Sequence, residues 1–323
     1  MARKTRDSKP ELARSPVIEE LPVACAQEAA AVEFFERKRW GDAPCCPHCG
    51  SQAVYKMAGR DGQRNARFLW RCRDCSKQYT VRVGTIFGES LIPLHKWARA
   101  FWEACACKNC ISALELSRKL QITHKSALFM MHRIRHAMAD DHASPPKMTG
   151  TVEADETYVG GKPRHKGHNA RGRGTKKEPV ASVLQRGGTV RSTVIPAVNG
   201  KNLRAVLLAN VCTSSRLITD QEGSYVKVGP EFQGGHETVN HRIREYARGD
   251  VTTNSVEGFF ARVKRGLNGT FHAVSREHLH RYLSGFDFAH NTRGMDDGAR
   301  TELCIQRGLG KRLEYADYVV RTA

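Results

Sequence analysis

The segment VTTNSVEGFFARVKRG, residues 251–266, carries an amide, an acid and a base at regular spacing. Asn254, Glu257 and Lys264 stand three and seven residues apart, so on a helix they lie along one stripe. Apolar residues at helical spacing predict that another stripe is buried: Val256, Phe259, Phe260 and Val263. An isolated polar stripe is most often a solvated face with an ion pair. A catalytic interpretation therefore needs further acids elsewhere in the chain.

Two strand-like segments carry such acids. Asp155 lies within TVEADETYV, residues 151–159, which alternates like a strand that can enter a core. Burying a carboxylate in such a strand costs free energy, so its presence there points to a specific role. Asp220 ends a second short apolar strand, RLITD, 65 residues further on. Glu153 shares the predicted face of Asp155 and Glu156 points away from it, and both are competing candidates.

Acids from two strands and one helix can converge at one edge of a mixed sheet. We expect Asp155, Asp220 and Glu257 to form this set, although Glu222 is another acid close to the second strand. The set could hold two Mg²⁺ or Mn²⁺ ions about 4 Å apart, as in phosphoryl-transfer sites. Each acid alone is better explained as a surface charge or a helix cap, so only their order and placement together favour a metal site.

The cysteines predict a second, structural metal centre. Two pairs, each spaced Cys-x-x-Cys, are separated by 22 residues, and together they offer four thiolates for one Zn²⁺: Cys46, Cys49, Cys72 and Cys75. The strand-like segment between the pairs favours a zinc ribbon. Cys45 and His48 are alternative ligands close by. All four positions would be filled by protein, so this zinc would not be catalytic.

The charge balance points to a polyanionic partner. The 323 residues include 52 Lys and Arg against 33 Asp and Glu, a formal net charge of +19. Nucleic acid is the most plausible partner, and a membrane surface is the weaker one. With no apolar run of about 18 residues and no apolar signal core, we expect a cytoplasmic protein near the nucleoid.

Residues 112–138 have the pattern of a helix-turn-helix. Ser112 and Glu115 form a capping box that starts a short helix, and Thr123 caps a longer one after a tight turn. We expect the second helix to present basic residues to double-stranded DNA: Lys125, Arg133 and Arg135.

A glycine-rich basic loop follows the first acidic strand. Residues 162–177 hold seven Lys or Arg and no acid, and we expect them to order on DNA. The candidate contacts there are Lys162, Arg164, Arg171, Arg173, Lys176 and Lys177, and Arg265 is a further candidate beside Lys264.

Taken in order, the motifs resemble one family. CPHCG, CRDC, TIFGESLIPLHKW, VEADETYVGGK, LITDQEGSY, VNH and TTNSVEGFFARVKRG, followed by GTFHAVSREHLHRYL, are similar to bacterial insertion-sequence transposases of the group numbered 1595. The resemblance spans about residues 22–291. It implies an RNase H-like domain with a divalent-metal DDE site, and binding to the terminal inverted repeats of a mobile element.

The resemblance also implies roles for single residues. Asp155 and Asp220 match the first two catalytic acids. The third position in this family is Asn or Glu, followed by a Lys, and here both Asn254 and Glu257 are present. We favour Glu257 because a carboxylate binds Mg²⁺ better than an amide does. Lys264 matches the lysine that holds a DNA phosphate.

The expected architecture is multidomain. It comprises a disordered basic arm (1–21), a zinc ribbon with a leading helix (22–90), a helix-turn-helix region (91–140), a linker (141–150), an α/β RNase H-like DDE domain with a mixed sheet (151–295) and a C-terminal tail (296–323). A transposase that joins two DNA ends should act as a homo-oligomer. The alternatives are an inactive DNA-binding regulator and a structure-selective nuclease on the same fold.

Overall fold

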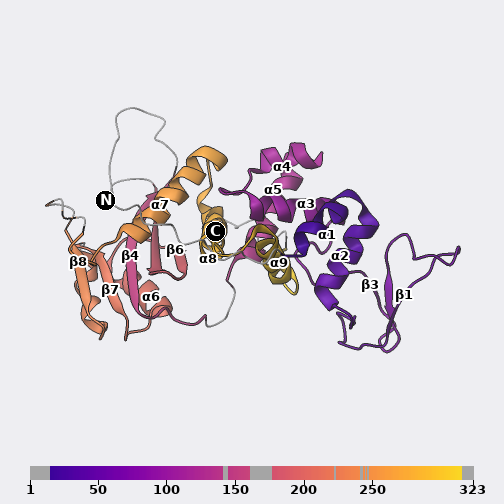
Figure 1. Ribbon diagram of the computed structural model, residues 1–323, viewed down its shortest axis with the longest axis horizontal. Coiled ribbons are helices and arrows are strands. Elements are labelled where there is room, and N and C mark those ends of the chain that lie inside the picture. The colour runs from indigo at the N-terminus through magenta and orange to yellow at the C-terminus, as the bar shows by residue number, and fades with distance from the viewer. Residues whose placement is uncertain are drawn as a thin grey trace, which may run out of the picture.

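The computed structural model describes residues 15–140, 145–160, 177–221, 223–240, 243, 245 and 247–314. Figure 1 shows a five-stranded sheet with its helices at one end of the molecule and a group of helices beside a small three-stranded sheet at the other. Within the described ranges, no helix is long and apolar enough to cross a membrane.

The N-terminal helices share one hydrophobic core. They are α1 (Val17–Ala26), α2 (Glu28–Trp40), α3 (Leu94–Ala106), α4 (Ala113–Leu120) and α5 (His124–Met138). Trp97 and Phe101 of α3 are completely buried at its centre. Such large aromatic side chains contribute most of the burial energy in a core of this kind.

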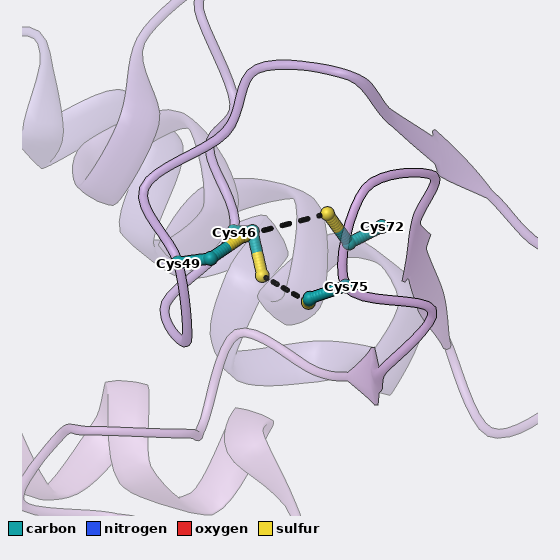
Figure 2. A group of neighbouring side chains, drawn as sticks. All are labelled: Cys46, Cys49, Cys72 and Cys75. Carbon is teal, nitrogen blue, oxygen red and sulfur yellow. Dashed lines mark hydrogen bonds between the residues drawn. The ribbon is translucent and has the colours of Figure 1, made fainter.

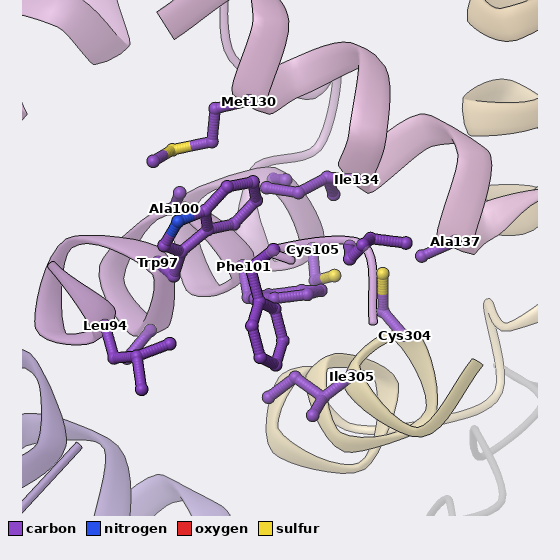
Figure 3. Close-up of a cluster of buried hydrophobic side chains, with 14 of the residues drawn as sticks. Leu94, Trp97, Ala100, Phe101, Cys105, Met130, Ile134, Ala137, Cys304 and Ile305 are labelled. Atoms are coloured by element: carbon purple, nitrogen blue, oxygen red, sulfur yellow. The ribbon is translucent and has the colours of Figure 1, made fainter. Parts of the chain in front are cut away.

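Two predicted boundaries are wrong. The expected tail contains α9 (Asp297–Gly308), which begins where the Asp296 side chain accepts hydrogen bonds from the amides of Gly298 and Ala299. Figure 3 shows Cys304 and Ile305 of α9 in the same buried cluster as α3 and α5, and both residues are fully buried. The expected N-terminal arm also ends early, because α1 already begins at Val17. Residues 1–14 and 315–323 lie outside the described ranges.

The zinc ribbon is a small antiparallel sheet attached to α2. Its strands are β1 (Val54–Lys56), β2 (Trp70–Cys72) and β3 (Gln78–Tyr79). Glu36 of α2 accepts a hydrogen bond of 2.7 Å from Trp70 Nε1 and forms an ion pair with Arg64. A buried carboxylate with two donors therefore ties the ribbon to the helical core.

The predicted caps of the helix-turn-helix are confirmed. Ser112 Oγ accepts from the Glu115 amide at 3.1 Å, and Thr123 Oγ1 accepts from the Ser126 amide at 3.1 Å. Gln121, between α4 and α5, has a φ of 52°, the left-handed conformation that allows the chain to turn sharply.

The larger sheet has strand order β6-β5-β4-β7-β8. Its strands are β4 (Thr151–Val159), β5 (Glu178–Gln185), β6 (Val190–Val194), β7 (Arg216–Asp220) and β8 (His236–Val239). β4, β5 and β6 are antiparallel neighbours, whereas β7 and β8 run parallel to β4. Three antiparallel strands extended by parallel ones form the mixed sheet of an RNase H-like domain.

Helices cover both faces of this sheet. One face packs against α6 (Gly200–Asn210), and the other against α7 (Asn254–Gly266) and α8 (Leu279–Asn291). Short turns of helix lie between them: η2 (Gly223–Tyr225), η3 (Gly229–Glu231), η5 (Leu267–Phe271) and η6 (Arg276–His278). Side chains alternate along β4: Val152 and Ala154 face α6, and Val159 faces α7. Odd-numbered residues of β4 therefore point towards α7.

Candidate functional site

The two strand acids lie side by side. β4 and β7 are parallel neighbours, and Glu153 is in register with Ile218. The same offset two residues further on places Asp155 of β4 beside Asp220, the last residue of β7. Asp155, in the middle of β4, therefore stands beside the carboxyl end of the adjacent strand β7.

Asp155 is close enough to the other acids for their charges to act on it. Loss of hydration, together with the negative charges of Glu156, Asp220 and Glu257, raises the pKa of Asp155 to about 8. The predicted set from two strands and one helix is therefore brought together in the structure. A carboxyl group with a raised pKa among other acids is a common feature of functional sites.

Glu257 is oriented by a neighbouring hydroxyl. Thr253, which is 1% exposed, donates a hydrogen bond of 2.6 Å from Oγ1 to Glu257 Oε1. Glu257 is half-buried on the first turns of α7, and its charge acts on Asp155. Asn254 is exposed at the first residue of the helix. The geometry thus agrees better with Glu257 than with Asn254 as the partner of the strand acids.

The competing acids on β4 are committed to other contacts. Glu156 accepts a hydrogen bond of 2.7 Å from the hydroxyl of Tyr225, which is buried with the α6 face of the sheet. Glu153 is completely buried and bonded to the start of α7. Glu222 lies outside the described residues.

The carboxylates offer oxygen atoms, the ligands that Mg²⁺ and Mn²⁺ prefer. Within the described part of the chain, the zinc-ribbon cysteines are the one set of at least three ligands whose atoms all lie within 4.8 Å of one another. Asp155, Asp220 and Glu257 are therefore more widely spread.

The predicted zinc ligands form a compact cluster. The four cysteines come from two facing loops of the ribbon (Figure 2), with Sγ–Sγ distances of 3.7 Å between Cys46 and Cys75 and 3.6 Å between Cys49 and Cys72. A tetrahedral Zn²⁺ with Zn–S bonds of about 2.3 Å requires sulfur atoms about 3.8 Å apart. The amide of His48 also points at Cys46 Sγ, at 3.4 Å. These residues fit a structural zinc.

A cleft with several basic residues lies between the end of β4 and the last turn of α7. Tyr158 and Gly160 of the β4 end line it, together with basic residues from three segments: Lys177, Lys264 and Arg276. Lys264 and Arg265 are exposed on the last turn of α7. The remaining predicted contacts in the basic loop lie outside the described residues: Lys162, Arg164, Arg171, Arg173 and Lys176.

The prediction that α5 presents Arg133 and Arg135 to DNA is wrong. Arg133 is 6% exposed and donates 2.8 Å hydrogen bonds to the carbonyls of Ile86 and Gly88. Arg135 is 2% exposed and its guanidinium lies 3.8 Å from the ring centroid of Tyr282 on α8. Both arginines pack inside the protein, whereas Lys125, at the start of α5, is exposed as predicted.

This difference predicts opposite phenotypes for two basic residues of one helix. Arg135→Ala should lower the free energy of unfolding by about 2–4 kcal/mol, because it leaves a cavity and removes the contact with Tyr282. Lys125→Ala should change stability by less than about 0.5 kcal/mol and weaken DNA binding instead. Urea unfolding and DNA titration would measure both effects. A stable Arg135→Ala protein with weakened DNA binding would contradict the buried role.

The raised pKa of Asp155 predicts a pH-dependent stability. Its folded value of about 8 exceeds the unfolded value of about 3.9, so between these limits the folded state keeps a proton that the unfolded chain has lost. Without added Mg²⁺ or Mn²⁺, stability should therefore fall as pH rises from about 4 to about 8. Asp155→Asn should show a shallower decline in urea unfolding. An equally steep decline in the variant would contradict this assignment.

Some residues of the site were not predicted from the sequence. Thr253 donates a hydrogen bond to Glu257, and Tyr225 donates one to Glu156. Arg186, the residue after β5, donates to the carbonyl of Thr252 in the segment before α7. The only sequence signal was that Glu153 shares a strand face with Asp155. From that signal alone, Glu153 was interpreted as a possible metal ligand rather than as a residue that holds α7.

Together, a four-cysteine ribbon, a helix-turn-helix and a mixed sheet with clustered acids define a zinc-ribbon protein with an RNase H-like domain. Residues 147–291 match the family model described as the ISXO2-like transposase domain, and residues 26–78 match the transposase zinc-ribbon domain. The chain belongs to this family of insertion-sequence transposases.

Individual relatives are more distant. The chain is 28% identical over 273 residues to an uncharacterized protein in the transposable element ISH50 of Halobacterium salinarum, covering 80% of this chain and 89% of that one. A chain of the simian T-cell lymphotropic virus intasome shares 14% identity, with 54% of this chain and 63% of that chain covered and a TM-score of 0.28. A chain of a pre-cleavage Mos1 transpososome shares 12%, with 64% and 76% covered and a TM-score of 0.23.

Proposed function

We propose that the protein catalyses transposition of its insertion sequence by metal-dependent cleavage and transfer of DNA strands. The observation that carries this proposal is the convergence of Asp155 in the middle of β4, Asp220 at the end of β7 and Glu257 on α7. The match to the ISXO2-like transposase domain supports it.

In this proposal Asp155, Asp220 and Glu257 hold two Mg²⁺ or Mn²⁺ ions. When bound, the ions supply Lewis-acid activation of the attacking oxygen and charge stabilisation of the leaving one. Thr253 keeps the Glu257 carboxylate turned to the site by its 2.6 Å hydrogen bond. The same arrangement serves water as the first nucleophile and a freed DNA 3′-hydroxyl as the second, since both steps are in-line phosphoryl transfers.

The basic groups would hold the DNA. Lys264 and Lys177 line the cleft at the end of β4 and would bind backbone phosphates of the DNA. Lys125 and the rest of the helix-turn-helix, with the zinc ribbon, would engage the terminal inverted repeats. Joining two element ends to target DNA requires at least two active sites, so the working assembly would be a homo-oligomer in the cytoplasm, at the nucleoid.

A strand-cleavage and joining assay tests the proposal. Labelled duplexes carrying the element's end would be incubated with the protein, a target plasmid and Mg²⁺. Transposase activity predicts cleavage at the end and covalent joining to the target. Tight binding without cleavage would identify a DNA-binding regulator. Cleavage of branched DNA with no need for the element's end, and no joining, would identify a structure-selective nuclease.

A further inference from the structure

The start of α7 is held by a residue from another element. Thr253, at the N-cap position, accepts no capping bond from the helix amides, and its hydroxyl donates to Glu257. Glu153 of β4 takes over the cap: its Oε2 accepts from the amides of Ser255, at 2.9 Å, and Val256, at 3.1 Å. The first-turn amides are therefore satisfied by a strand 102 residues away in sequence from Ser255.

Two further contacts complete the arrangement of Glu153, Ser255, Val256 and Arg186, which we call the clamp. The Ser255 hydroxyl lies 2.9 Å from Glu153 Oε1, and Arg186 Nε donates to the same oxygen at 2.7 Å. Arg186 also donates from Nη2 to the carbonyl of Thr252, at 2.8 Å. The clamp thus joins β4, the residue after β5 and the chain leading into α7.

A buried charge of this kind needs a compensating arrangement. Glu153 is 0% exposed, and burying a carboxylate costs several kcal/mol unless donors surround it. Here the donors are an arginine, a hydroxyl and the positive end of a helix dipole. An apolar pair could join a strand to a helix without this cost. The directional bonds instead set where along β4 the helix begins.

The position of the clamp links it to the acids. Glu153 and Asp155 are two residues apart on the same face of β4, so their side chains are about 7 Å apart along the strand. Glu257 lies on the same helix, only two residues after Ser255, the first clamped amide. β4, which carries Asp155, therefore also fixes where α7, which carries Glu257, begins and in which direction it runs.

We propose that Glu153 is a positioning residue, which locks the first turn of α7 to β4 so that Glu257 meets Asp155 and Asp220 in the geometry that takes up divalent ions. This role rests on the proposed function of the three acids. It does not require Glu153 to contact metal or DNA.

The test uses Asp287, a half-buried carboxylate that likewise accepts from a backbone amide and a serine hydroxyl, as the control for Glu153. Asp287 of α8 accepts from the amide of Ser192 at 2.8 Å and from its hydroxyl at 2.7 Å, but it holds α8 to β6 rather than α7 to β4. Glu153→Gln and Asp287→Asn keep the side-chain shapes and replace each carboxyl group with a neutral amide. Mn²⁺ affinity of the full-length proteins would be measured by electron paramagnetic resonance, below the melting temperature of each variant.

Glu153→Gln is expected to weaken Mn²⁺ binding by about 10–100-fold, the usual effect of losing a group that orients a metal ligand. Asp287→Asn should keep the wild-type affinity, even if it is equally destabilised. Combining Glu153→Gln with Glu257→Gln should give little further loss beyond Glu257→Gln alone, because both changes disable the same ligand. Hydrogen exchange of the Ser255 and Val256 amides should be faster in Glu153→Gln.

Three results would overturn the proposal: wild-type Mn²⁺ affinity in Glu153→Gln, full additivity in the double variant, or unchanged exchange at the two amides. A failure of the underlying function is recognised separately. If Glu257→Gln itself binds Mn²⁺ as tightly as the wild type, the three-acid metal site is wrong, and faster exchange in Glu153→Gln would then reflect a purely structural helix cap.

Discussion

Glu257→Gln and Asp155→Asn should each slow DNA strand cleavage and joining by at least about a hundredfold. Metal ions contribute several kcal/mol to such reactions, and each 1.4 kcal/mol or so corresponds to a factor of ten in rate. Both substitutions keep the shape of the side chain and remove a charged ligand. The measurement is the initial rate of cleavage of a labelled element end in saturating Mg²⁺, with the unfolding temperature of each variant checked in parallel.

Asn254→Ala is the matched comparison on the same helix stripe. Asn254 is exposed, and we expect this variant to keep cleavage within about threefold of wild type, the scale of a surface substitution of about 0.5 kcal/mol. Loss of activity in Asn254→Ala together with an active Glu257→Gln would transfer the third ligand position to Asn254. The choice between the two residues, left open by the family pattern, is therefore decided by one pair of variants.

Loss of zinc should unfold the ribbon and leave the sheet domain folded. The ribbon core contains few buried side chains, namely Cys46, Trp70, Cys72 and Tyr79, which is too little apolar burial to hold it without metal. Zinc binding in comparable small domains contributes roughly 10–16 kcal/mol. Cys72→Ser is thus expected to lose its zinc, to lose the near-ultraviolet signal of the buried Trp70 and to bind element ends weakly.

A thiol outside the ribbon provides the control for this experiment. Cys212 lies between α6 and β7, within 3.1 Å of the Ser214 hydroxyl, and Cys212→Ser should keep one zinc per chain and wild-type DNA binding. Zinc content by elemental analysis separates the two variants. A Cys72→Ser protein that retains stoichiometric zinc would show that another set of ligands, such as one including Cys45 or His48, holds the ion.

Local patterns predicted the elements that carry the acids. The residues 151–159 of the first acidic strand coincide with β4, and RLITD is β7, because period-two alternation with β-branched residues is a strong local signal. The expected helix at 251–266 begins at Asn254. β8 was not predicted, since its four residues, HETV, carry little apolar signal.

Tertiary contacts explain what the sequence could not predict. Arg133 and Arg135 belong to a basic helix whose exposed side cannot be identified until Tyr282 of α8 is known to cover it. α9 was missed because its buried face is completed by α1, α3 and α5, which lie far from it in the sequence. The role of Glu153 depends on an amide partner 102 residues away, so a buried acid beside Asp155 was interpreted as a possible metal ligand.

The central claim is that Asp155, Asp220 and Glu257 together bind the divalent ions of a DNA strand-transfer site. Anomalous diffraction from crystals of the protein bound to a pre-cut element end lacking its terminal 3′-hydroxyl, grown in Mn²⁺, tests it most directly. We predict two peaks, about 4 Å apart and at coordination distance from these three carboxylates. Peaks coordinated by other acids, or none at this edge of the sheet, would contradict the account.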